Sequence, residues 1–153
     1  MDTQRLVIPN HILLREVSSL LAEGKEVILM TKGNSMLPFI VGDRDSVRLK
    51  RMPGVEEGDV VLAQISEGHY VLHRVLKIDG ASATLMGDGN IKGTEQCTVS
   101  DICGTALAVI RPDGKETDLR SASSMRQARA WRRLLPCRRV ILGIYRRTIL
   151  KLI

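Results

Sequence analysis

The chain has 153 residues, a length at which one domain can bury a core of its own. Hydrophobic residues make up 44% and charged residues 26% of the sequence, which excludes a disordered chain. Aromatic residues make up only 3%, which disfavours a nucleic-acid binder that stacks bases on rings. Three cysteines without a C-x-x-C pair indicate neither a disulfide framework nor a zinc site, so we expect no metal and no other cofactor.

The net charge of +6 is distributed unevenly along the chain. Residues 121–153 carry nine basic side chains and no acidic one, which leaves 14 of the 23 basic side chains and all 17 acidic ones on residues 1–120. We therefore predict a domain over residues 1–120 and a separate basic tail over residues 121–153. A basic tail favours an anionic partner, and the scarcity of aromatic rings makes nucleic acid the least expected one.

The sequence also bears on location. Residues 1–9 read MDTQRLVIP and contain no apolar stretch typical of a secretory signal. No run approaches the roughly 18 apolar residues that a membrane-spanning helix needs. We therefore expect a cytoplasmic protein, with peripheral binding to the cytoplasmic face of a membrane as the role for the tail.

The predicted elements begin with an amphipathic helix over residues 10–23, with Asn10 as its N-cap and Gly24 as its stop. Seven short runs rich in Val, Ile and Leu then predict strands at residues 26–31, 45–50, 59–65, 69–78, 83–86, 102–111 and 115–119. The sequence Pro112–Asp113–Gly114 indicates a hairpin turn between the last two. The predicted fold class is mainly β: a coiled antiparallel β domain with an N-terminal helix and a basic amphipathic C-terminal helix.

Residues 121–151 return to helical periodicity, with serines at 121–124 to cap the start and Pro136 to break or kink the helix. One face is apolar and consists of Ile141, Leu142, Tyr145, Ile149 and Leu152. Two interpretations follow: a helix docked on the domain with a solvated basic face, or an interfacial helix lying on anionic lipid. In the second, the contacts come from Arg132, Arg133, Arg138, Arg139, Arg146, Arg147 and Lys151.

Two residues stand out as candidates for chemistry. Ser35 lies in a stretch whose composition, TKGNSMLP, is typical of a turn after a strand. His73 lies within a predicted strand and shares one face of it with Val71 and Val75, which would hold an imidazole rigidly. A serine and a partly desolvated histidine can form a nucleophile and its base, whereas each alone also fits a structural role. A metal site built from His69, His73 and Asp88 lacks a typical ligand spacing.

Five short motifs follow one another in a distinctive order: GNSMLPFIVGD at residues 33–43, EGDVV at 57–61, HRV at 73–75, GDGN at 87–90 and ICG at 102–104. Together they resemble the signal peptidase I family, within the signal peptidase/LexA-like clan of serine peptidases, and in particular its histidine-type branch. The resemblance covers residues 26–110. It implies a serine endopeptidase in which Ser35 is the nucleophile and His73 the general base, a position held by lysine in the common bacterial branch.

The resemblance also implies a substrate: a leader or signal-like peptide, bound as an added β-strand. Three departures modify this expectation. The stretch just after the GDGN motif, residues 91–96, contains no aspartate, so Asp88 and Glu95 are the two candidates to orient His73. Gly33 stands where many members carry a hydroxyl group that helps to bind the oxyanion, which leaves the Ser35 amide and Asn34. The family's transmembrane anchor is lacking, so the substrate is expected at the cytoplasmic side.

Two other functions are compatible with the same fold. One is a catalytically weak or inactive peptide-binding module in a membrane-associated maturation or export complex. The other is a self-cleaving repressor of the LexA type. This second alternative is disfavoured, because residues 1–24 are too short for a DNA-binding domain and a histidine occupies the position of the lysine base.

Overall fold

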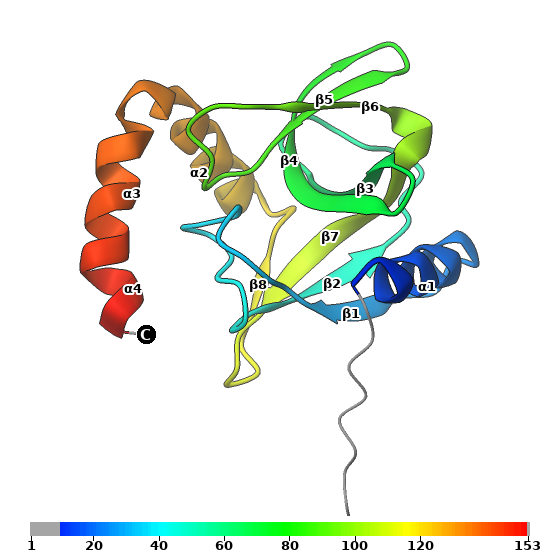
Figure 1. The fold of residues 1–153 in the computed structure, drawn as a ribbon, viewed down its shortest axis with the longest axis horizontal. Helices are drawn as coiled ribbons and strands as arrows, with labels where there is room; N and C mark the ends of the chain where they lie inside the picture. The colour runs from blue at the N-terminus through cyan, green and yellow to red at the C-terminus, as the bar shows by residue number, and fades with distance from the viewer. Residues whose placement is uncertain (1–9, 153) are drawn as a thin grey trace, which may run out of the picture.

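The computed structural model describes residues 10–152; residues 1–9, in which the sequence predicts no signal peptide, and residue 153 lie outside the described part. Eight antiparallel strands form one coiled sheet, preceded by helix α1 (Asn10–Ala22) and followed by a helical segment (Figure 1). The strands are β1 (Val27–Met30), β2 (Ser46–Lys50), β3 (Val60–Ser66), β4 (His69–Asp79), β5 (Ser82–Met86), β6 (Glu95–Thr98), β7 (Ile102–Ile110) and β8 (Glu116–Asp118). The mainly β fold with helices at both ends is confirmed.

All seven predicted strands are present, and one strand, β6, was missed. Its sequence, EQCT, is short and polar because β6 lies at the edge of the sheet, where alternate side chains face solvent. Helix α1 ends at Ala22, and the predicted stop, Gly24, follows it with a φ of 83° that suits glycine. The predicted hairpin joins β7 to β8, and the Arg111 amide donates to the Lys115 carbonyl across its turn at 2.8 Å.

The strands follow one another in the sheet as β1-β2-β7-β3-β4-β5-β6, with β8 also pairing with β7. The register shifts within four of the strand pairs, and these irregularities let the sheet bend on itself, so that β6 also contacts β3. The main core lies between α1 and the concave part of the sheet, where Leu21, Val47 and Leu49 are fully buried. A smaller core lies between β3, β4 and β5.

The C-terminal segment consists of α2 (Ala122–Arg133), the 3₁₀ turn η2 (Leu135–Cys137), α3 (Arg138–Arg147) and α4 (Ile149–Leu152). Ser121 caps α2 by accepting a hydrogen bond from the Ser124 amide at 3.1 Å, and Pro136 lies in η2, where the helix was predicted to break. Within residues 10–152 no helix is both long and apolar enough to cross a bilayer.

The apolar face that the sequence predicts for this segment is partly buried against the domain and partly exposed. Leu142 is buried and joins Trp131, Leu37 and Val41 in a third core cluster, and two further members of the predicted face, Ile141 and Tyr145, pack against it. The remaining two members, Ile149 and Leu152, are exposed. Docking on the domain is therefore the correct interpretation for the inner part of this face.

Arg138 does not belong to the exposed basic surface, which corrects its sequence-based assignment to an anionic partner. It is 3% exposed, and its guanidinium lies over the Trp131 ring at 5.0 Å from the ring centre. The same group donates to the Asn90 carbonyl at 3.0 Å. The cation is stabilised inside by an aromatic face and by carbonyl groups.

We predict that Leu142→Ala lowers the free energy of unfolding by about 3 kcal/mol, because it opens a cavity between α3 and the serine-bearing loop. The matched control is Ile144→Ala, two positions further along α3 on its exposed side, which is expected to cost less than about 0.5 kcal/mol. Urea unfolding of both variants measures the difference. Equal, small losses in the two variants would show that α3 does not dock through Leu142.

Candidate active site

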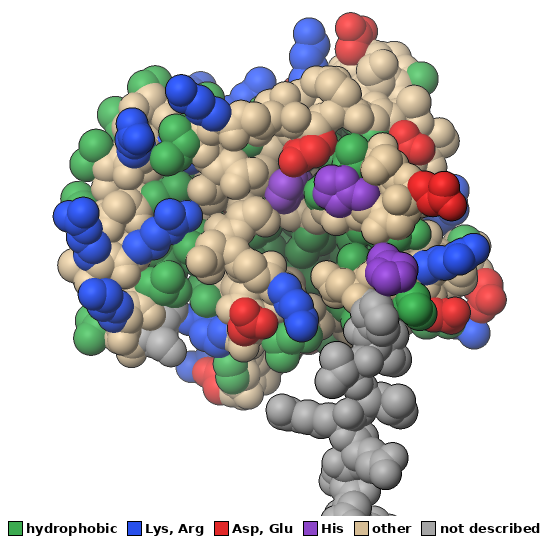
Figure 2. Space-filling model, in the orientation of Figure 1, with side chains coloured by type: hydrophobic (Ala, Val, Ile, Leu, Met, Phe, Trp, Pro, Cys, Tyr) green, Lys and Arg blue, Asp and Glu red, His purple; other side chains and the backbone are tan. Residues whose placement is uncertain are grey.

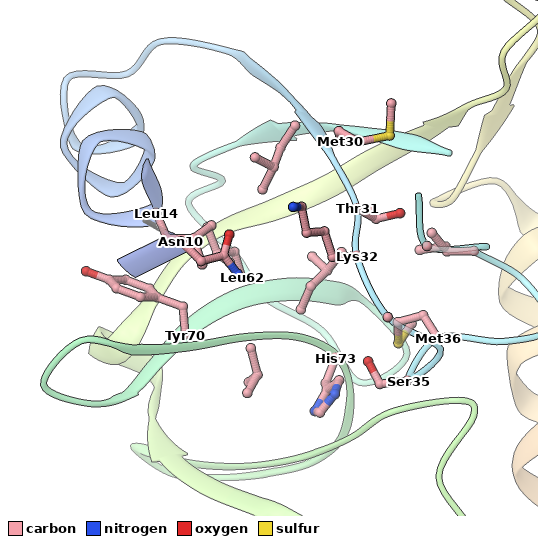
Figure 3. A pocket seen from close by; sticks show the side chains of 16 residues that line it. Asn10, Leu14, Met30, Thr31, Lys32, Ser35, Met36, Leu62, Tyr70 and His73 are labelled. Carbon is pink, nitrogen blue, oxygen red and sulfur yellow. The ribbon is translucent and has the colours of Figure 1, made fainter. Parts of the chain in front are cut away.

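The candidate site is a cleft of about 190 Å³ between α1, β1, β4 and the loop after β1. Apolar side chains line most of it, and Ser35 and His73 lie together at one end, while Asn10, Leu14 and Tyr70 lie at the other (Figure 3). In the space-filling view the cleft is a hollow with apolar side chains at its floor and histidine at its rim (Figure 2). The cleft thus brings together the serine and the histidine that the sequence singled out.

The loop that carries Ser35 is closed at its base by hydrogen bonds between Thr31 and Asp45. The Thr31 amide and hydroxyl donate to the Asp45 carbonyl at 3.0 and 2.7 Å, and the Asp43 amide donates to the Thr31 carbonyl at 2.8 Å. These bonds join the two ends of a segment of fifteen residues, 31–45, to each other beside strands β1 and β2. The loop therefore presents Ser35 from fixed ends.

The Asp45 carboxylate stabilises the inside of this loop. It is fully buried and accepts hydrogen bonds from the Val41 amide at 2.9 Å, from the Arg44 guanidinium at 2.7 Å and from Arg111 on the neighbouring β7–β8 turn at 2.5 Å. Burial raises the pKa of Asp45, but the hydrogen bonds from Arg44 and Val41 and the charge of Arg111 outweigh it. The pKa therefore lies below its ordinary value of 3.8.

His73 lies in the middle of β4 and is buried. Its Nδ1 is 2.9 Å from Oε2 of Glu95, the first residue of β6, and this contact fixes the plane of the ring. A Cβ placed on Gly87 would lie 3.1 Å from Nε2 of His73 and 2.4 Å from the Ser35 carbonyl oxygen. Nε2 of His73 and the Ser35 carbonyl oxygen therefore both lie beside Gly87.

The Ser35 side chain makes no hydrogen bond to His73 within residues 10–152, although Figure 3 shows both groups directed into the same space. Catalytic hydrogen bonds often form only when substrate is bound, so this geometry is compatible with a dyad. The Ser35 amide donates to no acceptor in the described part of the chain. Asn34 is exposed, and the residues that line the cleft do not include it.

The GDGN loop, residues 87–90, packs directly against the backbone of the turn that carries Ser35. The Gly89 amide donates to the Ser35 carbonyl at 2.8 Å, and a Cβ on Gly89 would lie only 2.2 Å from the Asn34 carbonyl oxygen. Any side chain at Gly87 or Gly89 would push the serine turn away, because both neighbours are backbone atoms. The two glycines of this motif thus permit two chain segments to touch.

Asp88 has a different role from the one considered in the sequence. It is buried and bonds through both carboxylate oxygens to Arg74, at distances between 2.7 and 3.1 Å, and not to His73. Its carbonyl accepts the Trp131 indole N–H at 2.8 Å. Of the two candidate acids, Glu95 is the one that contacts His73.

Arg74 was not identified from the sequence as a site residue. It follows His73 in β4 and points to the opposite face, where it pairs with Asp88, donates to the Gly58 carbonyl at 2.8 Å and lies 5.5 Å from the ring centre of Phe39. Arg and Asp both occur in the short motifs at 73–75 and 87–90, so residue type gave a signal. Their pairing could not be read without the fold.

No group of three or more His, Cys, Asp or Glu side chains within residues 10–152 is placed to hold a metal ion, so His69, His73 and Asp88 do not form the alternative metal site. A comparison with protein-family models found no match, and a comparison with curated protein sequences found none either.

We predict that Asp45→Asn lowers the free energy of unfolding by about 3 kcal/mol at neutral pH, because it leaves two guanidinium groups against a neutral side chain. Because the folded-state pKa of Asp45 is depressed, its stabilisation is present above the ordinary value of 3.8 and is lost as pH falls through the folded-state pKa. The gap between wild type and variant should therefore close in acid.

Urea unfolding at a series of pH values measures this gap. Asp79→Asn is the control, because Asp79 is exposed and its carboxylate makes no ion pair within residues 10–152. A pH-independent difference between wild type and Asp45→Asn would contradict the proposed electrostatic role.

Proposed function

We propose that the protein is a serine endopeptidase similar to signal peptidase I, which cleaves a leader or signal-like peptide. Ser35 acts as the nucleophile and His73 as the general base, while Glu95 is a positioning residue. The single observation that carries this proposal is the imidazole of His73, which is held through Nδ1 by a carboxylate while its Nε2 lies beside Gly87, as the Ser35 carbonyl does. This is the arrangement by which a serine becomes a nucleophile in serine hydrolases.

The reaction proceeds in two steps. Nε2 of His73 takes the hydroxyl proton as Oγ of Ser35 bonds to the scissile carbonyl carbon, and the same proton then passes to the leaving amine as the C–N bond breaks. Water, deprotonated by the same imidazole, hydrolyses the resulting ester and restores the serine. Glu95 contributes by stabilising the imidazolium and by keeping the ring in one orientation.

The developing oxyanion needs hydrogen-bond donors. The Ser35 amide is the donor that the geometry favours, because it lies at the nucleophile itself and is unpaired within residues 10–152. Asn34 is not favoured by its exposed position outside the cleft lining. Lys32 lines the cleft together with Gly33 and extends toward its middle (Figure 3).

An extended peptide is the substrate that best fits the cleft. Ligand pockets for compact small molecules are about 300–1,000 Å³, whereas this one has about 190 Å³, enough for a few small side chains. Strand β1 borders the cleft and pairs only with β2 within the described residues, so its other edge is open to a further strand. Leu29 and Met30 of β1 line the cleft beside that edge. We propose that the peptide is met in the cytoplasm or at its membrane boundary.

A second candidate function is a peptide-binding module that has the cleft without the reaction. The observation that favours it is the absence of a hydrogen bond between the Ser35 hydroxyl and His73 in the described part of the chain. Both candidates use the same groove, so binding of peptides does not distinguish them. Reactivity of the serine does.

We predict that a fluorophosphonate probe labels the full chain at Ser35, because Oγ displaces fluoride from phosphorus while His73 takes the proton. Labelling should be absent in Ser35→Ala and reduced by several orders of magnitude in His73→Ala. Ser66→Ala, which changes an exposed serine at the end of β3, should label like wild type. Mass spectrometry locates the adduct. A folded wild-type protein that stays unlabelled across the pH range would support the peptide-binding module instead.

We predict that Glu95 governs the rate of labelling, because its carboxylate stabilises the imidazolium that forms as His73 takes the serine proton. Glu95→Gln should lower the rate of labelling by up to about 10⁴-fold, since a neutral side chain stabilises the imidazolium poorly. Glu67→Gln, at an exposed turn, is the matched control. An unchanged labelling rate in folded Glu95→Gln would leave Glu95 with a purely structural role.

A further inference from the structure

The outer surface of the C-terminal helices is apolar to an unusual degree. Ten large hydrophobic side chains are exposed in the described part of the chain, and six of them lie between residues 134 and 152. They are Leu134, Leu135, Val140, Ile144, Ile149 and Leu152, with exposed fractions from 37% to 85%. We call this set the outer apolar surface. It is distinct from the inner face of α3, which Leu142 buries against the domain.

The same surface is uniformly cationic. Eight of the nine basic side chains of residues 121–153, all except Arg138, are exposed, and none of them forms an ion pair within residues 10–152. A surface that serves only solubility mixes both signs of charge, whereas this segment has no acidic side chain. In Figure 2, hydrophobic and basic side chains alternate over α3 and α4 at the left edge.

The two properties coincide on one stripe of α3. Val140 and Ile144 are four positions apart and therefore neighbours on the helix, and Arg147 follows three positions later on the same stripe. Arg139 and Arg146 flank it on one side. Long basic side chains beside an apolar stripe can keep their stems in a nonpolar layer and their charges in the polar layer above it.

We propose that this surface binds an anionic lipid bilayer, with α3 lying in the plane of the interface. A bilayer of this kind meets both requirements at once: lipid headgroups neutralise the cations, and the acyl boundary covers Val140, Ile144 and the exposed leucines. A nucleic acid would satisfy the cations only and leave the apolar side chains in water. The inference is independent of the proposed reaction, because it concerns the face of α3 opposite to the serine loop.

Flotation of the full chain with vesicles tests the proposal. We expect binding to vesicles of phosphatidylcholine with phosphatidylglycerol, little binding to phosphatidylcholine alone, and weaker binding as sodium chloride is raised. The double variant Arg139→Gln/Arg147→Gln should bind about 30-fold more weakly, if each cation near the surface contributes a factor of about five. Lys77→Gln/Lys92→Gln removes two exposed cations elsewhere and should bind like wild type.

The apolar requirement is tested separately. Val140→Ser/Ile144→Ser should reduce binding at least tenfold, whereas Ile12→Ser/Ile28→Ser, which changes two exposed residues of α1 and β1, should not. Thermal unfolding verifies that the variants are folded. In addition, Ile144→Trp should show a blue shift in emission on anionic vesicles that wild type, whose single tryptophan is the buried Trp131, does not show.

Three results would overturn the proposal. They are no binding by the folded wild type, equal binding with and without anionic lipid, and full retention of binding by Val140→Ser/Ile144→Ser. If the third of these results came together with tight binding of the wild type to RNA, the surface would be assigned to a polyanion instead of a bilayer.

Discussion

The buried ion pair between Arg74 and Asp88 is the contact on which the arrangement of the site depends. It joins the longest strand, β4, to the GDGN loop through bidentate hydrogen bonds, and Nη1 of Arg74 donates to the Gly58 carbonyl. Two charges can be buried in this way only when nearly all their hydrogen bonds are made. Since His73 precedes Arg74, and Gly87 and Gly89 flank Asp88, the pair also sets the distance between the histidine and the serine turn.

The C-terminal helices also hold the GDGN loop in place. The Trp131 indole donates to the Asp88 carbonyl, and Arg138 stacks on Trp131 and donates to the Asn90 carbonyl. The loop that carries Asp88 therefore lies between the sheet on one side and α2 and α3 on the other. In the proposed assignments, α3 has two faces with different tasks: its inner face supports the serine loop and its outer face meets lipid.

The acid that contacts His73 illustrates how a fold can supply a function from an unexpected position. Glu95 begins β6, an edge strand separated from β4 by β5, and its side chain reaches the imidazole because the sheet is coiled. The extra methylene of glutamate relative to aspartate extends that reach. In the proposed peptidase, a glutamate on β6 takes the place of the aspartate that the family resemblance implies after the GDGN motif.

The sequence by itself determined the fold class, α1, seven of the eight strands and the break at Pro136, because hydrophobic periodicity and turn residues act over a few neighbouring positions. It also singled out Ser35 and His73, which the tertiary structure places at one cleft. It did not decide between Asp88 and Glu95 as the acid beside His73, and it missed β6, whose pattern is polar.

Tertiary structure alone decided these points, and it decided which arginine of the tail is buried. The faces of a helix become inner and outer only when a partner packs on one of them. Arg138 and Arg139 are adjacent in sequence, yet Arg138 is buried over the Trp131 ring and Arg139 is exposed to solvent. Contacts between segments far apart in the chain, such as Arg74 with Asp88, depend on how the sheet coils, and no local pattern encodes that.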